Sequence, residues 1–167
     1  MAYGNSVKTE AFSTVYSGET YPVGSCRVQP AAEVTDADAS LVGDRVWMFV
    51  QADANGFTAN QLLKRAVATR SFAASTSSTN NDIELINLIG VAGHDVAANQ
   101  YGWIIVKGEC VVKAKAGTAA GNNITSSDSA VGTCQPAAGG ATDSFAVFGR
   151  ALTAVAGGIV DAYVDFR

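Results

Sequence analysis

Short apolar segments separated by glycine turns are the feature that most constrains the fold of this chain. Seventeen glycines are spread over 167 residues. In the C-terminal third, glycines at 117, 121, 132 and 139–140 interrupt the sequence roughly every ten residues, a spacing typical of β-sandwiches and barrels. Segments this short favour strands over helices, because a helix needs more residues to bury one side. The pattern predicts an all-β fold: a small β-barrel or β-sandwich body with Gly-rich loops.

Two regions carry the strongest strand signals. Val46–Val50 (VWMFV) is a continuous run of β-branched and aromatic residues, which predicts a strand buried on both faces. Tyr101–Val106 and Cys110–Lys115 are β-rich segments on either side of Lys107–Glu109. The central glycine of this short connection predicts a hairpin.

A second hairpin is predicted at the C-terminus. Segments 145–153 and 159–166 are joined through a turn at Gly157 and Gly158. Within the last segment Val160, Ala162, Val164 and Phe166 alternate with Ile159, Asp161, Tyr163 and Asp165. Because side chains alternate across a strand, the first set is expected to face the core and the second to face water or a partner.

Between these regions the local signals are mixed. Thr58 and Gln61 have the spacing of a helix-capping box, so residues 62–67 form either one or two helical turns or a strand. A strand is predicted from Ile83 onward, and the glycines of Gly90–Gly93 are expected to turn a sharp corner after it.

The N-terminal region differs in composition from the rest. Residues 1–40 are polar and interrupted by Pro22 and Pro30, which predicts an extended N-terminal arm with one short strand near Ser25–Gln29. Residues 41–167 then form the body. Within it, the Ser/Thr/Asn-rich segment 69–82 is expected to be a flexible loop.

The sequence offers little for catalysis. His94 is the only histidine, and it lies in a Gly-His-Asp turn without a G-x-S-x-G nucleophile motif. The acidic groups at 36–38 and 80–82 do not complete a calcium loop, and no phosphate-binding glycine motif occurs. We therefore expect no catalytic, cofactor-binding or metal-binding residues, no cofactor, and a protein that is not an enzyme.

The cysteines and the charges narrow the class of protein further. Cys26, Cys110 and Cys134 are an odd number without a C-x-x-C pair, so they are expected to be small buried hydrophobes, although pairing is left open. The net charge is −4, and the 11 Lys and Arg form no basic run, so nucleic-acid binding is not expected. No apolar stretch approaches the ~20 residues of a membrane span, which predicts a chain made in the cytoplasm that does not enter a membrane.

The surface composition favours assembly. Charged residues make up 16% of the chain, against about 25% in a usual globular domain. A surface short of charge suits a subunit whose faces are covered by neighbours. Trp47 and Trp103 lie in strong β runs, so they are expected in the core rather than on a stacking platform.

Two stretches resemble the capsid decoration (cement) proteins of tailed phages. The first is Arg45–Leu63 (RVWMFVQADANGFTANQLL), and the second runs from Ile89 to Val164, with the pieces IGVAGHDVAANQYGWIIVKGECVVKA and FGRALTAVAGGIVDAYV. The resemblance implies a barrel or sandwich body, a homotrimer, and a place on the outer capsid surface where it ties subunits of the major capsid protein together. It transfers no residue roles, because the shared pieces are those that make the fold.

The expected function is therefore a virion structural protein that decorates and stabilises the outside of a phage capsid by bridging its subunits. The alternative is a phage adhesion, fibre or knob module that binds host glycans through Trp103 or Tyr163. The lysines near residue 107 either form a docking patch or protect an edge strand. The candidate contacts to the capsid or to a sister protomer are Val7, Phe12, Val15, Tyr16, Tyr21, Lys107, Lys113 and Tyr163.

Overall fold

A computed structural model of the chain describes residues 11–34, 41–65, 73–76, 87–127, 130–137 and 147–166, with only the backbone described for 73–76. The elements in chain order are β1 (Cys26–Gln29), η1 (Ala31–Glu33), β2 (Arg45–Ala52), β3 (Leu62–Arg65), β4 (Ala73–Thr76), β5 (Leu88–Ala92), β6 (Tyr101–Lys113), β7 (Asn123–Ser126), β8 (Cys134–Pro136), β9 (Gly149–Ala151) and β10 (Ile159–Asp165). The all-β prediction is confirmed. No helix in these residues has the length and apolar character needed to cross a membrane.

The strands form one hydrogen-bonded sheet in the order β1-β2-β4-β3-β5-β6-β10-β9-β7-β8. All pairings are antiparallel except β2 with β4. β2 also pairs with β6, so the run from β2 through β4, β3, β5 and β6 returns to β2. The sheet as a whole is not closed into a barrel, because β1 and β8 stand at its two ends. The barrel alternative is therefore wrong.

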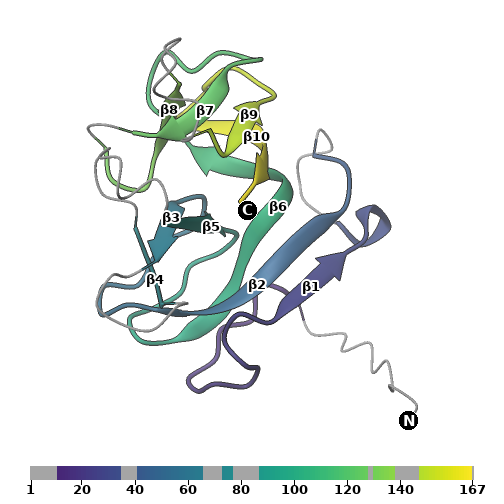
Figure 1. The fold of residues 1–167 in the computed structure, drawn as a ribbon, viewed down its shortest axis with the longest axis vertical. Helices are drawn as coiled ribbons and strands as arrows, with labels where there is room; N and C mark the ends of the chain where they lie inside the picture. Colours follow the sequence, from purple (N-terminus) through teal and green to yellow (C-terminus); the bar gives the residue numbers. More distant parts are fainter. Residues whose placement is uncertain are drawn as a thin grey trace.

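The long strand β6 connects the two parts of the sheet (Figure 1). Its first half pairs with β2 on one side and with β5 on the other, and its second half, from Lys107 to Lys113, pairs with β10. In Figure 1 the small strands β7 to β10 gather at one end of β6, and β1 to β5 gather at the other. β6 thus holds the N-terminal and C-terminal halves together.

The predicted hairpin at Lys107–Glu109 is wrong, because β6 runs through these residues without a turn. Gly108 has a φ of 112°, and the register between β2 and β6 shifts at Val46. A Cβ on Gly108 would lie 2.5 Å from the carbonyl oxygen of Asp44. The glycine allows β6 to bend away from β2 and continue beside β10. Gly108 therefore does mark an unusual backbone position, but it bends a strand and does not close a hairpin.

Two apolar clusters cover opposite faces of the β2–β6 pair. Trp47 and Phe49 of β2 contribute to the larger cluster, whereas Met48 and Val50 contribute to the smaller one. β6 divides its side chains in the same way, with Trp103 in the larger cluster and Ile104 in the smaller. The prediction that Val46–Val50 is a strand covered on both faces is confirmed, and the two tryptophans lie in the core as expected.

The C-terminal hairpin is confirmed. β10 pairs with β9 in antiparallel register, and the turn at 156–159 carries positive φ angles at Gly157 and Gly158. The apolar positions of β10 at 160, 162 and 164 are buried, whereas Ile159 and Tyr163 are exposed. The alternation in the sequence therefore gave the correct faces.

Two segments whose sequence patterns are ambiguous form strands in the structure. Gln61 accepts a hydrogen bond from the Thr58 backbone N–H at 2.7 Å, as in a capping box, yet residues 62–65 form β3 because Leu62 and Leu63 pair with β5. Gly90 lies inside β5 rather than at a corner. A Cβ there would lie 2.7 Å from the Ile105 carbonyl oxygen, so the glycine permits close approach to β6.

Part of the predicted flexible loop is also strand. Residues 73–76 form β4, which pairs with β2 and β3, and the rest of segment 69–82 lies outside the described residues. The predicted start of a strand at Ile83 lies outside them too, and the described part begins with β5 at Leu88. The sequence of β4 has little apolar signal, so its strand conformation comes from the backbones of its neighbours.

We expect Gly108→Ala to lower the free energy of unfolding by about 3–4 kcal/mol, because it adds a steric clash with Asp44 to the cost of a positive φ. Gly117→Ala is the matched control: its φ is also positive, at 93°, but the space around it is open. The control should cost about 1–2 kcal/mol. Urea denaturation of both variants measures the difference, and equal losses would contradict the proposed close contact.

Candidate functional site

The aromatic residues of the N-terminal arm pack on the core of the same chain. Phe12 stacks on Trp47 with ring centroids 4.8 Å apart and also meets the edge of Trp103. Tyr21 makes edge contacts with Phe49 and Trp103, at 5.2 Å in each case. These candidate contacts therefore form part of the core in this chain. The candidate Val7 lies outside the described residues.

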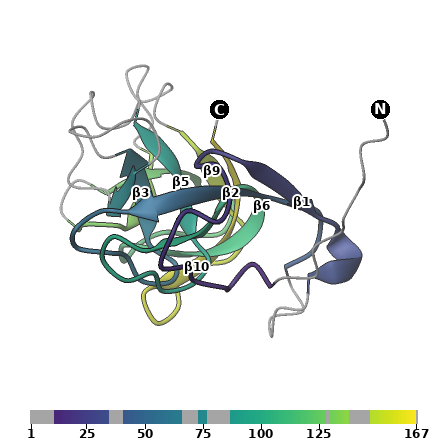
Figure 2. The same cartoon turned by 90° about the horizontal axis from the view of Figure 1, so that it is seen from below.

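Backbone and charge contacts fix the arm in place. Tyr16 and Tyr101 exchange two backbone hydrogen bonds of 2.9 Å, which join the arm to the start of β6. The Arg27 guanidinium lies 4.8 Å from the Phe12 ring centre and 5.4 Å from that of Trp103. Figure 2 shows the purple segment before β1 passing over β2 and β6. Val15 points outward and is 37% exposed.

The predicted short strand near residues 25–29 is confirmed as β1, which pairs with β2. Its first residue, Cys26, is exposed, so the expectation of three buried cysteines is wrong for this one. Cys26 begins an edge strand whose side chains are exposed or half-buried in alternation. Cys110 and Cys134 are buried as expected, and burial raises the pKa of the Cys134 thiol to about 12. All three are free thiols.

His94 does not form a catalytic pair with Asp95. The Asp95 carboxylate accepts a hydrogen bond from the Ala59 N–H at 2.7 Å. Both ring nitrogens of His94 are buried without a hydrogen-bond partner in the described part of the chain. The ring packs over Gly102, where a Cβ would lie 3.1 Å from Nε2. Burial lowers the pKa of His94, and the charge of Asp95 opposes this only in part.

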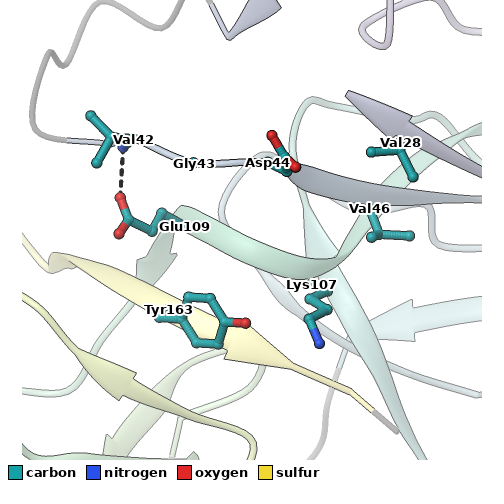
Figure 3. Close-up of a pocket in the computed structure, with 8 residues that line it drawn as sticks. All are labelled: Val28, Val42, Gly43, Asp44, Val46, Lys107, Glu109 and Tyr163. Atoms are coloured by element: carbon teal, nitrogen blue, oxygen red, sulfur yellow. Dashed lines mark hydrogen bonds between the residues drawn. The ribbon is translucent and has the colours of Figure 1, made fainter. Parts of the chain in front are cut away.

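A groove of about 520 Å³ lies on the surface of the described part of the chain. It crosses the outer face of four neighbouring strands, β1, β2, β6 and β10. Val28, Val46 and Lys107 follow one another across the first three strands, and Glu109 lies opposite Tyr163. Figure 3 shows the lining residues, which are Val28, Val42, Gly43, Asp44, Val46, Lys107, Glu109 and Tyr163.

The segment Val42–Asp44 forms one wall of this groove, and two carboxylates hold it. The Glu109 carboxylate accepts a hydrogen bond from the Val42 N–H at 2.6 Å, which Figure 3 draws as a dashed line. Asp44 accepts one from the Ala31 N–H at 2.9 Å. Beneath them, the buried Arg45 donates from Nε to the Glu109 carbonyl. The wall is therefore held by hydrogen bonds to β6 and to the segment after β1.

Most of the groove surface is apolar. Val28 and Val42 are 62% and 64% exposed, and Tyr163 is 39% exposed. Lys107 forms an ion pair with Asp165 at 3.0 Å, so its charge is largely neutralised. Such a surface suits the binding of another polypeptide. Within the described residues no group of His, Cys, Asp and Glu is arranged to hold a metal ion.

The groove brings together two of the residues selected from the sequence, Lys107 and Tyr163. It does not include Lys113, whose ammonium donates to the Thr58 hydroxyl at 3.0 Å. Sequence reasoning missed Val28, Val42 and Glu109. For Glu109 a signal existed, because it lies two residues after Lys107 and so shares a strand face with it. The wrongly predicted hairpin hid this relation.

A comparison with solved structures finds similar chains, whereas comparisons with protein families and curated proteins find no match. This chain is similar to the solved structure of the head fiber gp8.5 N base of bacteriophage phi29, with 20% sequence identity and a TM-score of 0.49. The alignment covers 72% of this chain and 94% of the other. A TM-score below 0.5 does not establish a common fold, so this similarity by itself assigns no function.

The packing of the arm predicts that Phe12→Ala lowers the free energy of unfolding by about 2 kcal/mol, roughly half the loss for a fully buried phenylalanine. Val15→Ala serves as control, because that side chain is partly exposed, and it should cost less than about 0.5 kcal/mol. Urea unfolding followed by tryptophan fluorescence reports both. A loss below 0.5 kcal/mol for Phe12→Ala would show that the arm is not part of the folded core.

The buried neutral His94 predicts lower stability in mild acid. Because its pKa is lowered in the folded state, the unfolded chain binds more protons below the ordinary value of about 6.5. The contribution of neutral His94 to the free energy of unfolding is complete above that pH. It is lost as the pH falls toward the pKa of His94 in the folded state. The free energy of unfolding should therefore decrease between pH 7.5 and 5.5, and His94→Gln should reduce this decrease. An identical decrease in the variant would contradict the assignment to His94.

Proposed function

We propose that this chain is a virion structural protein that decorates the outer surface of a phage capsid and bridges its subunits. The partners in this proposal are the major capsid protein and further copies of the chain in a homotrimer. The role is one of contact, without catalysis and without a cofactor. The protein would be synthesised in the host cytoplasm and then added to the shell.

The resemblance in sequence to capsid decoration proteins supports the proposal. The two segments that carry this resemblance contain the central strands of the sheet. Arg45–Leu63 includes β2, and Ile89–Val164 includes β6 and most of β10. These three strands supply half of the residues that line the groove. The low content of charged residues also fits a subunit that is surrounded by neighbours.

The single observation that carries the proposal is the apolar groove on a rigid four-strand face. Its three most exposed apolar side chains come from β1, from the segment before β2 and from β10, so their spacing is fixed by the sheet. Burying such a patch supplies binding energy at about 25 cal/mol per Å² of apolar surface. A modest gain for each protomer becomes large when many copies repeat the same contact on one shell.

The N-terminal arm is less suitable than the groove for testing the proposal. Phe12, Tyr16 and Tyr21 are held against the core of their own chain, so they are not free to reach along a capsid subunit without unfolding. Deletion of residues 1–22 would therefore test stability and binding together. Substitutions in the groove separate the two.

Purified chain mixed with undecorated shells should co-sediment with them, and Val42→Asp should weaken this binding about tenfold or more, because it places a charge in an apolar contact. Val131→Asp is the control: that side chain is 52% exposed and does not line the groove. Circular dichroism checks that both variants fold. No sedimentation of the unchanged chain would contradict the proposal, and glycan binding without shell binding would favour an adhesion module instead.

A further inference from the structure

We propose that the groove binds a segment of a partner protein that places a lysine or arginine beside an apolar side chain. This inference rests on the proposed function, because the partner is taken to be a protein subunit of the shell. It goes further by naming the chemistry that the groove recognises. The inference is drawn from the charged residues that line the groove, because Lys107 has an ion-pair partner whereas the two carboxylates have none in the described part of the chain.

The positions of the groove residues follow from the strand registers. Val28 of β1 lies opposite Val46 of β2, Val46 lies opposite Lys107 of β6, and Lys107 lies opposite Asp165 of β10. One row therefore begins with two valines and ends with an ion pair. In the next row Glu109 of β6 lies opposite Tyr163 of β10. The valines and the tyrosine ring form an apolar floor on which an apolar side chain can pack.

The charges of the lining residues are unbalanced, although the buried Arg45 lies beneath the wall and donates to the Glu109 carbonyl. Lys107 is paired with Asp165, which does not line the groove. The two carboxylates of the lining, Asp44 and Glu109, each accept a hydrogen bond from a backbone N–H and have no salt-bridge partner in the described part of the chain. Backbone donors satisfy hydrogen bonding but carry no full charge. An occupant that brings a cation therefore gains attraction at this wall.

The apolar floor and the two carboxylates together determine which kind of peptide segment fits the groove. A purely apolar segment would leave the two carboxylates partly desolvated without compensation, and an acidic segment would be repelled by them. A lysine or arginine can lay its methylene chain along Val42 and keep its charged end at the carboxylates, because such side chains are apolar along their length and charged at the tip. A neighbouring valine or leucine then packs on Val28 and Tyr163.

A peptide titration tests this without any capsid. The probe is the blocked pentapeptide threonine-valine-lysine-valine-threonine, and its analogues carry norleucine or glutamate in place of lysine. Amide shifts of the ¹⁵N-labelled chain should move at Val28, Gly43, Val46 and Glu109. The lysine peptide should bind about three- to tenfold more tightly than the norleucine peptide, as expected for two partly exposed ion pairs, and the glutamate peptide more weakly than either.

Substitutions then assign the effect to the two carboxylates. The double variant Asp44→Asn and Glu109→Gln keeps both hydrogen-bond acceptors but should remove the preference for lysine. Asp53→Asn is the matched control, because Asp53 also accepts one backbone N–H at 2.9 Å, from Asn55, but lies outside the groove. It should bind the lysine peptide like the unchanged chain.

Three results would overturn the inference: equal affinity for the lysine and norleucine peptides, shifts confined to residues outside the groove, or shifts of the groove amides on dilution without peptide. The last result would mean that a second copy of the chain occupies the groove. If the chain sediments with shells but the lysine peptide shows no preference, the inference fails and the proposed function stands. If the peptides bind as expected and shells do not, the preference of the groove for a cation stands, but the proposed function and the shell subunit as its partner fail.

Discussion

The close approach between the start of β2 and Gly108 of β6 is the contact on which the rest of the structure depends. Because Gly108 has no side chain, the Asp44 carbonyl and Arg45 reach the backbone of β6 there. β6 bends at this point and passes from the side of β2 to the side of β10. One strand therefore belongs to both halves of the sheet, and the buried Arg45 fixes the junction by its hydrogen bond to the Glu109 carbonyl. A residue with a Cβ at 108 would force the two halves apart.

The same junction explains why the surface groove exists. Where β6 changes partners, four strands lie side by side, and their outward positions carry valines, Lys107, Glu109 and Tyr163. The segment before β2 has to cross Glu109 to reach Gly108, so Val42 becomes one wall of the groove. The groove is thus a consequence of how the sheet is joined. Its shape therefore depends mainly on main-chain positions in the sheet.

The N-terminal arm shows how polar sequence can become part of a core. Phe12, Tyr16 and Tyr21 are too irregularly spaced for a helix or a strand. Together they pack on the aromatic rings of Trp47, Phe49 and Trp103. The arm covers a face of β2 and β6 that the described strands leave open. Its aromatic residues therefore contribute to the stability of the chain, and they are not part of the exposed groove on β1, β2, β6 and β10.

The sequence by itself determined the strand class, the buried run at Val46–Val50 and the alternation in β10, because these depend on side chains a few residues apart. It also marked Lys107 and Tyr163. The tertiary structure alone decided that Gly108 bends a strand instead of closing a hairpin, that residues 73–76 pair between β2 and β3, and that Val28 and Val42 meet beside Glu109. Those outcomes depend on backbones far apart in the chain, and a glycine permits a turn, a bend or a close approach equally well until its neighbours are known.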